Sequence, residues 1–223
     1  VSQSYWTRAA APVNSTDVHV NIHSIYELFW KTFRRKRISF FFSLFGVGPA
    51  TTVLDAGGGE YFWKLAERLG LPVPRVTIMN LGARPDGLPA RYSFVSGDGR
   101  HMPFGNKEFD LVFSNSVIEH VGGRDDRRKF AEEIGRVGRG YFVQTPDRRF
   151  PVEPHLFTPF VHWLPESMLV RLNPAYTIRG LLSSPAEQEV KDLKSVRLLN
   201  VDDMKSYFPD SEIVVERFLA IPK

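Results

Sequence analysis

The pattern that most constrains the fold is a short apolar strand that runs directly into three consecutive glycines. Residues Thr52–Ala56 have the length and composition of a buried strand, and Gly57–Gly59 follow without a break. Glycines permit a tight turn and let the backbone approach a ligand closely. Beyond the turn, apolar residues at helical spacing over 62–69 predict a helix that ends at Gly70. Neither a complete dinucleotide fingerprint nor a phosphate-binding P-loop is present, because the required third glycine and the Gly-Lys-Ser/Thr sequence are missing.

The alternation of strands and helices continues along the chain. Apolar runs predict four further strands, and a helix with acidic residues in its first turn precedes the last of them. These elements are the strands Arg75–Met79, Tyr92–Val95, Phe109–Ser114 and Gly140–Gln144, and the helix Asp125–Val137. Such alternation predicts βαβ units, and hence an α/β fold whose mostly parallel sheet has helices on both faces. Ligands bind such sheets beyond the carboxyl ends of the strands, so the site is expected there.

Residues 147–195 interrupt this rhythm. Seven prolines lie between Pro146 and Pro185, counted inclusively, which is too many for a regular crossover. We expect residues 147–195 to form a lid or acceptor-pocket insertion within a single domain over residues 51–223. After the insertion, the pattern predicts a short strand at 196–199, a helix at 201–208, and a sixth strand of the sheet at 212–219.

The first 50 residues differ from the rest in charge and organisation. A loosely ordered arm is expected over residues 1–20, followed by a helix that begins near Ser24, stops at Gly46 and covers the site. Residues 1–50 carry six Lys or Arg against two acidic residues, whereas residues 51–223 carry 23 of each. The net charge of +4 therefore belongs to the N-terminal region, and it gives no reason to expect a nucleic-acid partner for the rest of the chain.

The basic run Arg34–Arg37 precedes an apolar patch at Phe40–Phe45 and resembles an interfacial membrane anchor. The apolar stretch 38–48 is too short to span a bilayer and lies too far along the chain for a signal peptide. We favour a helix whose apolar face packs on the domain while its basic turn is solvated, with membrane contact through residues 34–45 as the alternative. The chain has no cysteine, which excludes disulfides and thiolate chemistry, and a cytoplasmic location is expected.

Four blocks in this sequence, in order and at the expected spacing, carry a resemblance to a known family. They are Val53–Gly59, Val76–Asn80, Gly97–Phe104 and Phe109–Val121. With these blocks the chain resembles the class I S-adenosylmethionine-dependent methyltransferases of the type 11 group. The resemblance implies a Rossmann-like methyltransferase fold, S-adenosylmethionine as cofactor and S-adenosylhomocysteine as product. The family sheet has seven strands, so with six found here we expect the last strand to be lacking and one sheet edge to be unpaired.

The resemblance also implies roles for particular residues. Asp55 would orient the turn and the cofactor's amino group, Asp98 would accept a hydrogen bond from the adenine, and Asn80 would meet the ribose. The implied cofactor-binding residues are Asp55, Gly57, Gly58, Gly59, Asn80, Leu81, Asp98, Gly99, Arg100, Asn115 and Ser116. Asn80 departs from the family pattern, in which an acidic residue accepts both ribose hydroxyls. An amide is neutral, so a charge-assisted bond is lost at this position.

The acceptor side of the site is less defined by the sequence. Methyl transfer needs a base only if the nucleophile is a weakly acidic hydroxyl, and His120 and His155 are the candidate bases. Each has a structural alternative, a backbone hydrogen bond for His120 and a surface pair with Glu153 for His155. Glu153, His162 and Trp163 are the candidate substrate residues, with a packed pair that fixes the lid as the favoured alternative for His162 and Trp163. No cluster has metal-ligand spacing, so no metal is expected.

Three functions are compatible with these observations. The leading hypothesis is methyl transfer to a small-molecule acceptor, with an oxygen nucleophile such as a sugar or natural-product hydroxyl. An RNA or protein methyltransferase is the second, suggested by the sequence pI near 9.4 but opposed by the neutral charge of residues 51–223. The third is a non-catalytic partner or membrane-surface module on the same fold. The sequence contains no indication of an oligomeric state.

Overall fold

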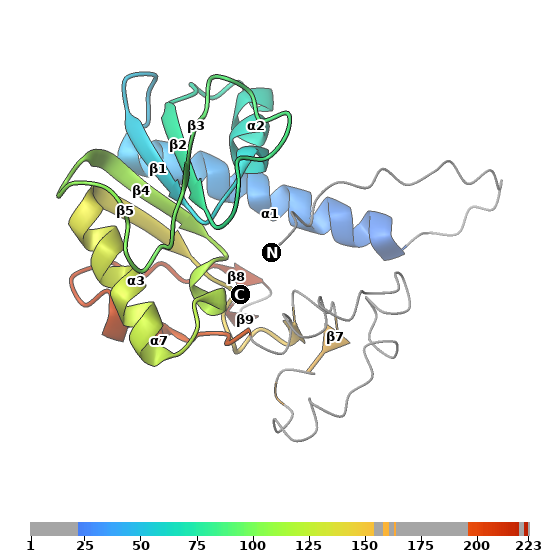
Figure 1. Cartoon of the computed structure of the whole chain (residues 1–223). Coiled ribbons are helices and arrows are strands. Elements are labelled where there is room, and N and C mark those ends of the chain that lie inside the picture. The colour runs from blue at the N-terminus through green and yellow to red at the C-terminus, as the bar shows by residue number, and fades with distance from the viewer. Residues whose placement is uncertain (1–21, 154–157, 161–162, 164–195, 219–220, 223) are drawn as a thin grey trace. The chain divides into compact units, whose positions relative to one another are not determined.

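A computed structural model describes residues 22–153, 158–160, 163, 196–218 and 221–222 (Figure 1). The expected arm over residues 1–20, His155, His162 and most of the insertion lie outside the described residues. The described chain forms two compact units. Unit 1 contains the chain up to Phe113 together with Arg136–Phe142, and unit 2 contains Ser114–Gly135 and the chain from Val143 onward.

The fold is built on a five-stranded sheet with the strand order β3-β2-β1-β4-β5 (Figure 1). Its strands are β1 (Thr52–Ala56), β2 (Arg75–Asn80), β3 (Ser93–Ser96), β4 (Phe109–Asn115) and β5 (Gly138–Gln144). The pairs β1–β2, β1–β4 and β2–β3 are all parallel. Because β1 has a parallel neighbour on each side, its end lies at the centre of the sheet edge where such folds bind ligands. These observations confirm the expected α/β, Rossmann-like fold.

The core of unit 1 forms where two helices cover the sheet. Helix α1 (Ile22–Phe45) and helix α2 (Glu60–Arg68) contact each other, and both contribute to one hydrophobic cluster with β1, β2 and β4. The N-terminal helix predicted from the sequence is confirmed, and it is part of this core. Its buried members include Ile38, Phe41 and Phe42, so the two compact units do not divide at residue 50.

The pairing of β1 with β4 is reinforced at the start of both strands. The Asp110 carboxylate accepts hydrogen bonds from the Thr52 backbone N–H at 2.9 Å and from the Thr52 hydroxyl at 2.8 Å. The Asp110 N–H in turn donates to the Thr52 hydroxyl oxygen at 3.0 Å. These contacts lower the pKa of Asp110, chiefly through the bond from the Thr52 backbone N–H. They fix the register of two strands that are 58 residues apart in the chain.

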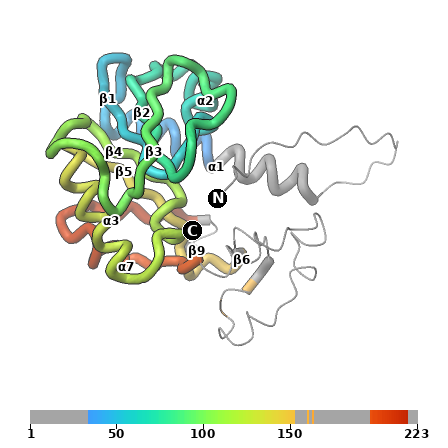
Figure 2. Tube along the Cα trace, in the orientation of Figure 1, coloured from blue at the N-terminus to red at the C-terminus, as the bar shows by residue number. Residues whose placement is uncertain are grey.

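Unit 2 contains the remaining helices and strands (Figure 2). They are the 3₁₀ helix η1 (Ile118–His120), helix α3 (Arg124–Val137, of which the last two residues belong to unit 1), the strands β6 (Val152–Glu153) and β7 (Thr158–Pro159), helix α7 (Val201–Tyr207), and the strands β8 (Arg217–Phe218) and β9 (Ile221–Pro222). Strands β6 and β7 form one antiparallel pair, and β8 and β9 form another.

Two expectations for the C-terminal region are wrong. Residues 212–216 carry no strand, and only Arg217–Phe218 pairs, with β9 rather than with the five-stranded sheet. The short strand expected at 196–199 is reduced to a single bridge between Leu199 and Asp147. The run Glu212–Glu216 is rich in β-branched residues, but a strand also needs a partner with free backbone groups. Among the described residues, the sheet therefore has five strands instead of the expected six.

Candidate active site

The end of β1 is shaped by a glycine turn. Gly57 has a φ of +82°, a conformation that L side chains rarely adopt, and its N–H donates to the Met79 carbonyl of β2 at 2.7 Å. Gly59 is extended and precedes the first residue of α2, with no side-chain cap on the helix. A Cβ added at Gly59 would meet no atom within 4 Å. The turn thus presents bare backbone and the start of a helix to open space.

Asp55, the fourth residue of β1, lies directly beneath this turn. The residue is only 1% exposed, and its Oδ2 accepts a hydrogen bond from the Trp63 indole N–H at 2.8 Å. Its Oδ1 is buried and has no hydrogen-bond partner among the described residues. A Cβ at Gly58 would collide with this carboxylate, so glycine is required there by close approach. Burial raises the pKa of Asp55 to about 7, although the Trp63 bond opposes the shift.

Asn80 ends β2 and contacts the same turn. Its Nδ2 donates to the carbonyls of Gly57, at 3.1 Å, and of Gly58, at 3.0 Å. Its Oδ1 accepts a hydrogen bond from the Leu81 N–H at 2.8 Å, while the Leu81 side chain is 66% exposed. The sequence placed Asn80 at the site but gave no indication that its amide would bond the glycine turn.

Asp98 and Arg100 follow β3 and form a local ion pair. The Arg100 Nη2 lies 2.6 Å from Asp98 Oδ2, and the Arg100 backbone N–H donates to Asp98 Oδ1 at 2.9 Å. The guanidinium holds the pKa of Asp98 below its usual value. Because both side chains are more than a third exposed, solvent screens this pair and it contributes little to stability.

Unit 1 therefore brings together, at the carboxyl ends of adjacent parallel strands, most of the residues predicted for cofactor binding. Asp55 lies in the buried part of β1 one residue before its end, Asn80 ends β2, and Asp98 follows β3. Each side chain is already engaged inside the protein, by Trp63, the glycine carbonyls and Arg100 respectively. Trp63 was not singled out by the sequence reasoning, although it lies within the apolar helical pattern expected over residues 62–69.

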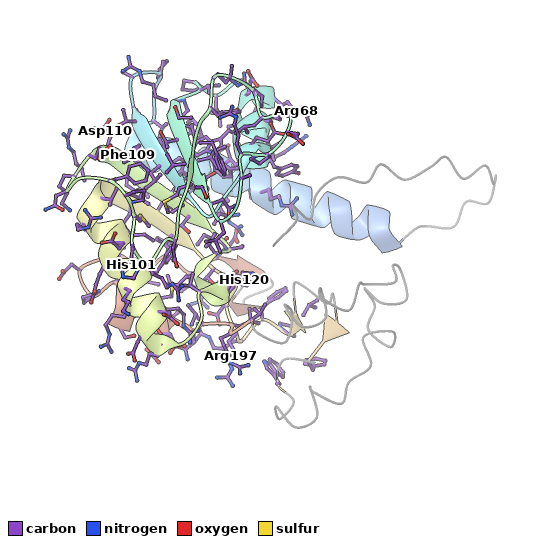
Figure 3. The ribbon with its side chains drawn as sticks, viewed as in Figure 1. Arg68, His101, Phe109, Asp110, His120 and Arg197 are labelled. Atoms are coloured by element: carbon purple, nitrogen blue, oxygen red, sulfur yellow. The ribbon has the colours of Figure 1, made fainter. Side chains whose placement is uncertain are left out.

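Unit 2 contains the remaining predicted residues of the cofactor and acceptor sides. Ser116 has a φ of +57°, its N–H donates to the Gln144 carbonyl at 2.8 Å, and its hydroxyl lies 3.2 Å from Gln144 Oε1. Asn115 is half-buried at the end of β4. His120 is exposed and projects from η1 (Figure 3). An exposed imidazole can exchange protons with an approaching molecule, which is compatible with the expected role as a base.

Beside His120 lies a buried carboxylate that the sequence reasoning did not single out. Glu119 is 1% exposed, and its Oε2 accepts a hydrogen bond from the Thr145 hydroxyl at 2.9 Å. Its backbone carbonyl accepts from the Arg197 N–H at 3.0 Å. Glu119 thereby links the residues after β4 to those after β5 and to the segment before α7. An acidic residue followed by a histidine after a predicted strand is a sequence signal that could have found it.

Only part of the predicted acceptor segment is described. Glu153 lies in β6, and Trp163 donates from its indole N–H to the Arg148 carbonyl at 2.9 Å. The Trp163 ring packs against Phe160, with 5.1 Å between ring centroids, and both side chains are at least half exposed. His155 and His162, predicted as a base and a substrate residue, lie outside the described residues. Trp163 thus has a packing partner other than His162.

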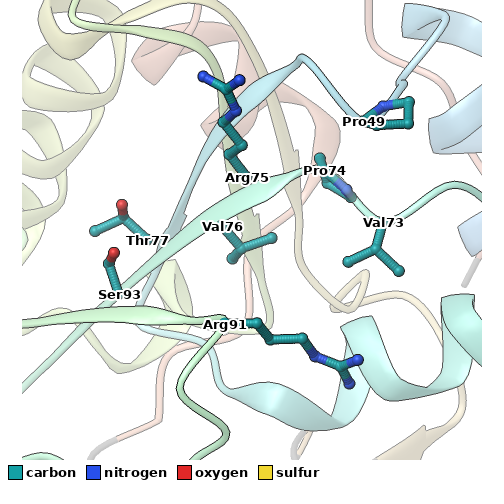
Figure 4. A pocket seen from close by; sticks show the side chains of 8 residues that line it. All are labelled: Pro49, Val73, Pro74, Arg75, Val76, Thr77, Arg91 and Ser93. Atoms are coloured by element: carbon teal, nitrogen blue, oxygen red, sulfur yellow. The ribbon is translucent and has the colours of Figure 1, made fainter.

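Two hollows in the described part of the chain lie away from the glycine turn. A shallow hollow of about 490 Å³ lies along the beginnings of β2 and β3, where its lining includes Arg75, Thr77 and Ser93 (Figure 4). This is the opposite end of β2 from Asn80. A second hollow of about 330 Å³, in unit 2, lies beside the start of α7 and includes Arg149 and Arg217. Within the described ranges, no group of three or more His, Asp or Glu side chains could hold a metal ion.

Residues 55–142 match the family of methyltransferase domains designated type 11. This stretch begins at Asp55, contains the glycine turn and ends in β5. Residues 55–142 are thus a class I S-adenosylmethionine-dependent methyltransferase domain of the type 11 group, which confirms the resemblance identified from the sequence. No helix in the described part of the chain is both long and apolar enough to cross a bilayer.

Curated relatives include both O- and N-methyltransferases. A probable chloroplastic tocopherol O-methyltransferase of Oryza sativa subsp. japonica is 33% identical over 96 residues, which cover 39% of this chain and 25% of that protein. Ajmaline N-methyltransferase of Rauvolfia serpentina is 42% identical over 55 residues, which cover 25% of this chain and 18% of that protein. The matches therefore span a quarter or less of the length of these relatives.

Similar solved structures agree on the fold. Phosphoethanolamine N-methyltransferase 2 of Haemonchus contortus, solved with S-adenosyl-L-methionine, superposes with a TM-score of 0.50 over 77% of this chain and 35% of that chain. The two sequences are 17% identical. At this sequence identity the likeness shows a shared fold, namely the arrangement of the sheet and its helices.

The end of β1 has the features that a nucleoside cofactor with a charged amino acid tail requires. A buried carboxylate oxygen lies without a partner beneath a turn that presents bare backbone. The first N–H groups of α2 follow, and they have no intrahelical acceptors. The residues present in unit 1 thus fit S-adenosylmethionine.

Proposed function

We propose that this protein transfers a methyl group from S-adenosylmethionine to a small-molecule acceptor, with an oxygen atom as the nucleophile. The observation that carries the proposal is the end of β1, where the buried Asp55 carboxylate lies beneath the bare Gly57–Gly59 turn. The family match over residues 55–142 supports the cofactor class. The substrate class is supported by the even charge balance of residues 51–223, where a macromolecular polyanion would require a basic surface.

The cofactor would be held by the glycine turn, Asp55, Asn80 with Leu81, and the Asp98–Arg100 segment. When bound, S-adenosylmethionine supplies a methyl group on a positively charged sulfur that leaves as a neutral thioether. The protein's part is to align the nucleophile and to exclude water. Asp55 would orient the cofactor's amino group with its unpartnered oxygen. The roles of Gly99, Asn115 and Ser116 in this proposal rest on the family resemblance alone.

On the acceptor side, we assign His120 as the base that takes the proton from a hydroxyl nucleophile. Its exposure on η1 supports this role, as does the anchoring of the adjacent Glu119 by Thr145. Residues 147–195, with Glu153, His155, His162 and Trp163, would shape the acceptor pocket. A cytoplasmic location belongs to the same proposal.

Calorimetric titration with S-adenosylhomocysteine tests the cofactor. We expect saturable binding to the wild type and at least tenfold weaker binding to Asp98→Asn, which lacks the charge at the adenine position. Asp86→Asn removes an exposed carboxylate from the same unit and should bind like the wild type. Absence of binding to the folded wild-type protein would refute the proposal.

The acceptor atom is tested separately with deuterium-labelled S-adenosylmethionine and matched panels of hydroxyl and amine compounds. Mass spectrometry then shows which compounds gain the labelled methyl group. We expect transfer to hydroxyl compounds, and transfer reduced at least a hundredfold in His120→Ala with cofactor binding unchanged. Transfer to amines alone would leave the methyltransferase class in place but contradict the oxygen acceptor.

A further inference from the structure

Asn80 uses the Nδ2 group of its side-chain amide to hold the glycine turn. The Nδ2 group has two N–H donors, and the two carbonyls within its reach are those of Gly57 and Gly58, at 3.1 and 3.0 Å. The orientation of the amide follows from its other side, because the Leu81 N–H at 2.8 Å can be met only by an oxygen. The amide is therefore fixed with its donors toward the turn.

The turn also depends on β2 through its backbone. The Gly57 N–H donates to the Met79 carbonyl at 2.7 Å, one residue before Asn80. Gly57 and Gly58 have no side chains that could pack the turn in place, and Gly59 faces open space. The end of β2 thus supplies three hydrogen bonds to the glycine turn.

We propose that Asn80 is a positioning residue that fixes the glycine turn in its binding conformation, and that aspartate at this position would weaken cofactor binding. This inference rests on the proposed function. The family resemblance implies that an acidic residue here improves binding by accepting the ribose hydroxyls. In this chain a carboxylate would have no donor for the two glycine carbonyls and would place negative charge about 3 Å from both of them.

The charge state of the substituted residue gives this positioning role a distinctive signature. A protonated aspartic acid can donate one hydrogen bond, whereas its ionised form donates none. Binding to Asn80→Asp should therefore recover in part as the pH falls. A direct ribose contact through the carboxylate would give the opposite pH trend, because the ionised form is the better acceptor.

The first experiment follows the turn without any cofactor. Hydrogen exchange, read by mass spectrometry on peptides covering residues 56–62, is compared for the wild type, Asn80→Asp, Asn80→Ala and the control Asn106→Asp. The Asn106→Asp control makes the same chemical change at an exposed position of the same unit. We expect exchange at least fivefold faster in both Asn80 variants and unchanged in the control. Asn80→Ala keeps the test valid if Asn80→Asp fails to fold.

The second experiment measures the affinity for S-adenosylhomocysteine by calorimetry at about pH 4, near the ordinary pKa of an aspartate, and at about pH 8. Each Asn80→Asp affinity is compared with that of the wild type at the same pH, because Asp55 also titrates between these values. At the higher pH we expect Asn80→Asp to bind at least tenfold more weakly than the wild type, with a smaller deficit at the lower pH. Wild-type binding with equal or tighter binding to Asn80→Asp would overturn the inference, and so would unchanged exchange in residues 56–62. If the wild type itself fails to bind, the proposed function fails, and the exchange result still decides whether Asn80 holds the turn.

Discussion

The Asp55 carboxylate is 1% exposed, and only one of its oxygens accepts a hydrogen bond, from the Trp63 indole. Ionising a carboxylate in such a buried position costs free energy. This explains why the pKa of Asp55 is raised to about 7, whereas the pKa values of Asp98 and Asp110 are lowered by their donors. The pKa shifts of these three aspartates of one unit thus differ in sign. Burial raises the pKa of Asp55, whereas hydrogen bonds lower those of Asp98 and Asp110.

The raised pKa of Asp55 makes folding stability depend on pH. Between about pH 4 and 7 the folded protein keeps a proton that the unfolded chain has released, so this residue lowers stability as the pH rises through that window. Asp55→Asn cannot ionise, and its stability relative to the wild type should increase by about 1.4 kcal/mol per pH unit between pH 5 and 7. Urea denaturation at pH 5, 6 and 7 measures this.

Asp110→Asn provides a control of opposite sign. The lowered pKa of Asp110 stabilises the fold above the unfolded pKa and loses this effect as the pH falls through the lower, folded value. Asp110→Asn should therefore be less stable than the wild type at neutral pH, with a gap that closes in acid. An Asp55→Asn gap that stays constant with pH would contradict the ionisation account.

Adjacent glycines of the turn should respond differently to the same substitution. Gly58→Ala places a methyl group onto the Asp55 carboxylate and should cost about 1–3 kcal/mol through overpacking. Gly59→Ala meets nothing within 4 Å on an extended backbone, so the free energy of unfolding should change little. Thermal unfolding separates the two variants. Equal losses would mean that the carboxylate and the turn are not in close contact.

At the residue scale, the sequence located the site but not its internal bonds. The positions of Asp55, Asn80 and Asp98 followed from their places at strand ends. Their partners Trp63, the glycine carbonyls and Arg100 depend on side-chain directions, which have no periodic signal in a sequence. Glu119 was overlooked for the same reason, since its hydrogen-bond partner Thr145 lies 26 residues away in the chain.

Among the elements, helix α1 is held by a cluster of aromatic rings. The Phe41 ring is fully buried, with 4.9 Å between its centroid and that of Phe113 in β4. Its other ring neighbours are Phe42, Phe45, Phe62, Trp63 and Phe142. Because the Phe41 side chain joins α1 to α2 and the sheet, we expect helix α1 and the core of unit 1 to unfold together.

Phe41→Ala tests this packing. Removing a fully buried ring should lower the free energy of unfolding by about 3–5 kcal/mol, through lost burial and the cavity left behind. Leu44→Ala, at a site that is 53% exposed in the same helix, should cost less than about 1 kcal/mol. Chemical denaturation with a helix-sensitive probe distinguishes them. Similar losses from both variants would mean that α1 docks through its exposed side instead.

Helix α7 is short and depends on its N-cap residue Asn200, which directly precedes it. The Asn200 side chain accepts a hydrogen bond from the Asp203 N–H at 2.9 Å, and the Asp203 carboxylate accepts from the Asn200 N–H at 3.0 Å. Asn200→Ala breaks this capping box and should lower stability by about 1 kcal/mol. Asp210→Asn, an exposed change after the helix, is the matched control, and thermal melts of both variants decide the outcome.

Element positions were largely predictable because burial imposes a period on the sequence. Helices α1, α2, α3 and α7 and the strands of the main sheet appear within two residues of their expected bounds. The prediction of a strand that includes residues 212–216 is wrong for a different reason. Its apolar run satisfies the local preference for a strand, whereas pairing is decided by which backbone edge lies nearby, and that information is not local.

At the scale of the whole molecule, positive charge is concentrated in one part of the chain. Arg35 and Lys36 are exposed on α1, next to the half-buried Arg37. On α3, Arg124, Arg128 and Lys129 are also exposed but alternate with acidic residues. The clustered charges create a local field, whereas the interspersed charges on α3 largely cancel one another.

Two triple variants of equal net charge test this asymmetry. The first variant changes Arg35, Lys36 and Arg37 to Gln, and the second changes Arg124, Arg128 and Lys129 to Gln. The first should lower the salt concentration at which the protein elutes from heparin substantially more than the second. Binding of S-adenosylhomocysteine should be unaffected in the first triple. Equal shifts in elution for the two triple variants would show that heparin binding depends on the net charge of the protein and not on where the charges lie.

The pairing of β1 with β4 also has a consequence for biosynthesis. Thr52 and Asp110, which set this register, are separated by 58 residues. At roughly 5–20 residues per second, a ribosome takes about 3–12 s to make the intervening chain. During that interval the apolar strand β1 lacks its β4 partner, and a parallel pair cannot close early as a hairpin does. The nascent chain thus passes through a stage in which one edge of β1 has no strand partner, and unpaired strand edges favour association with other chains.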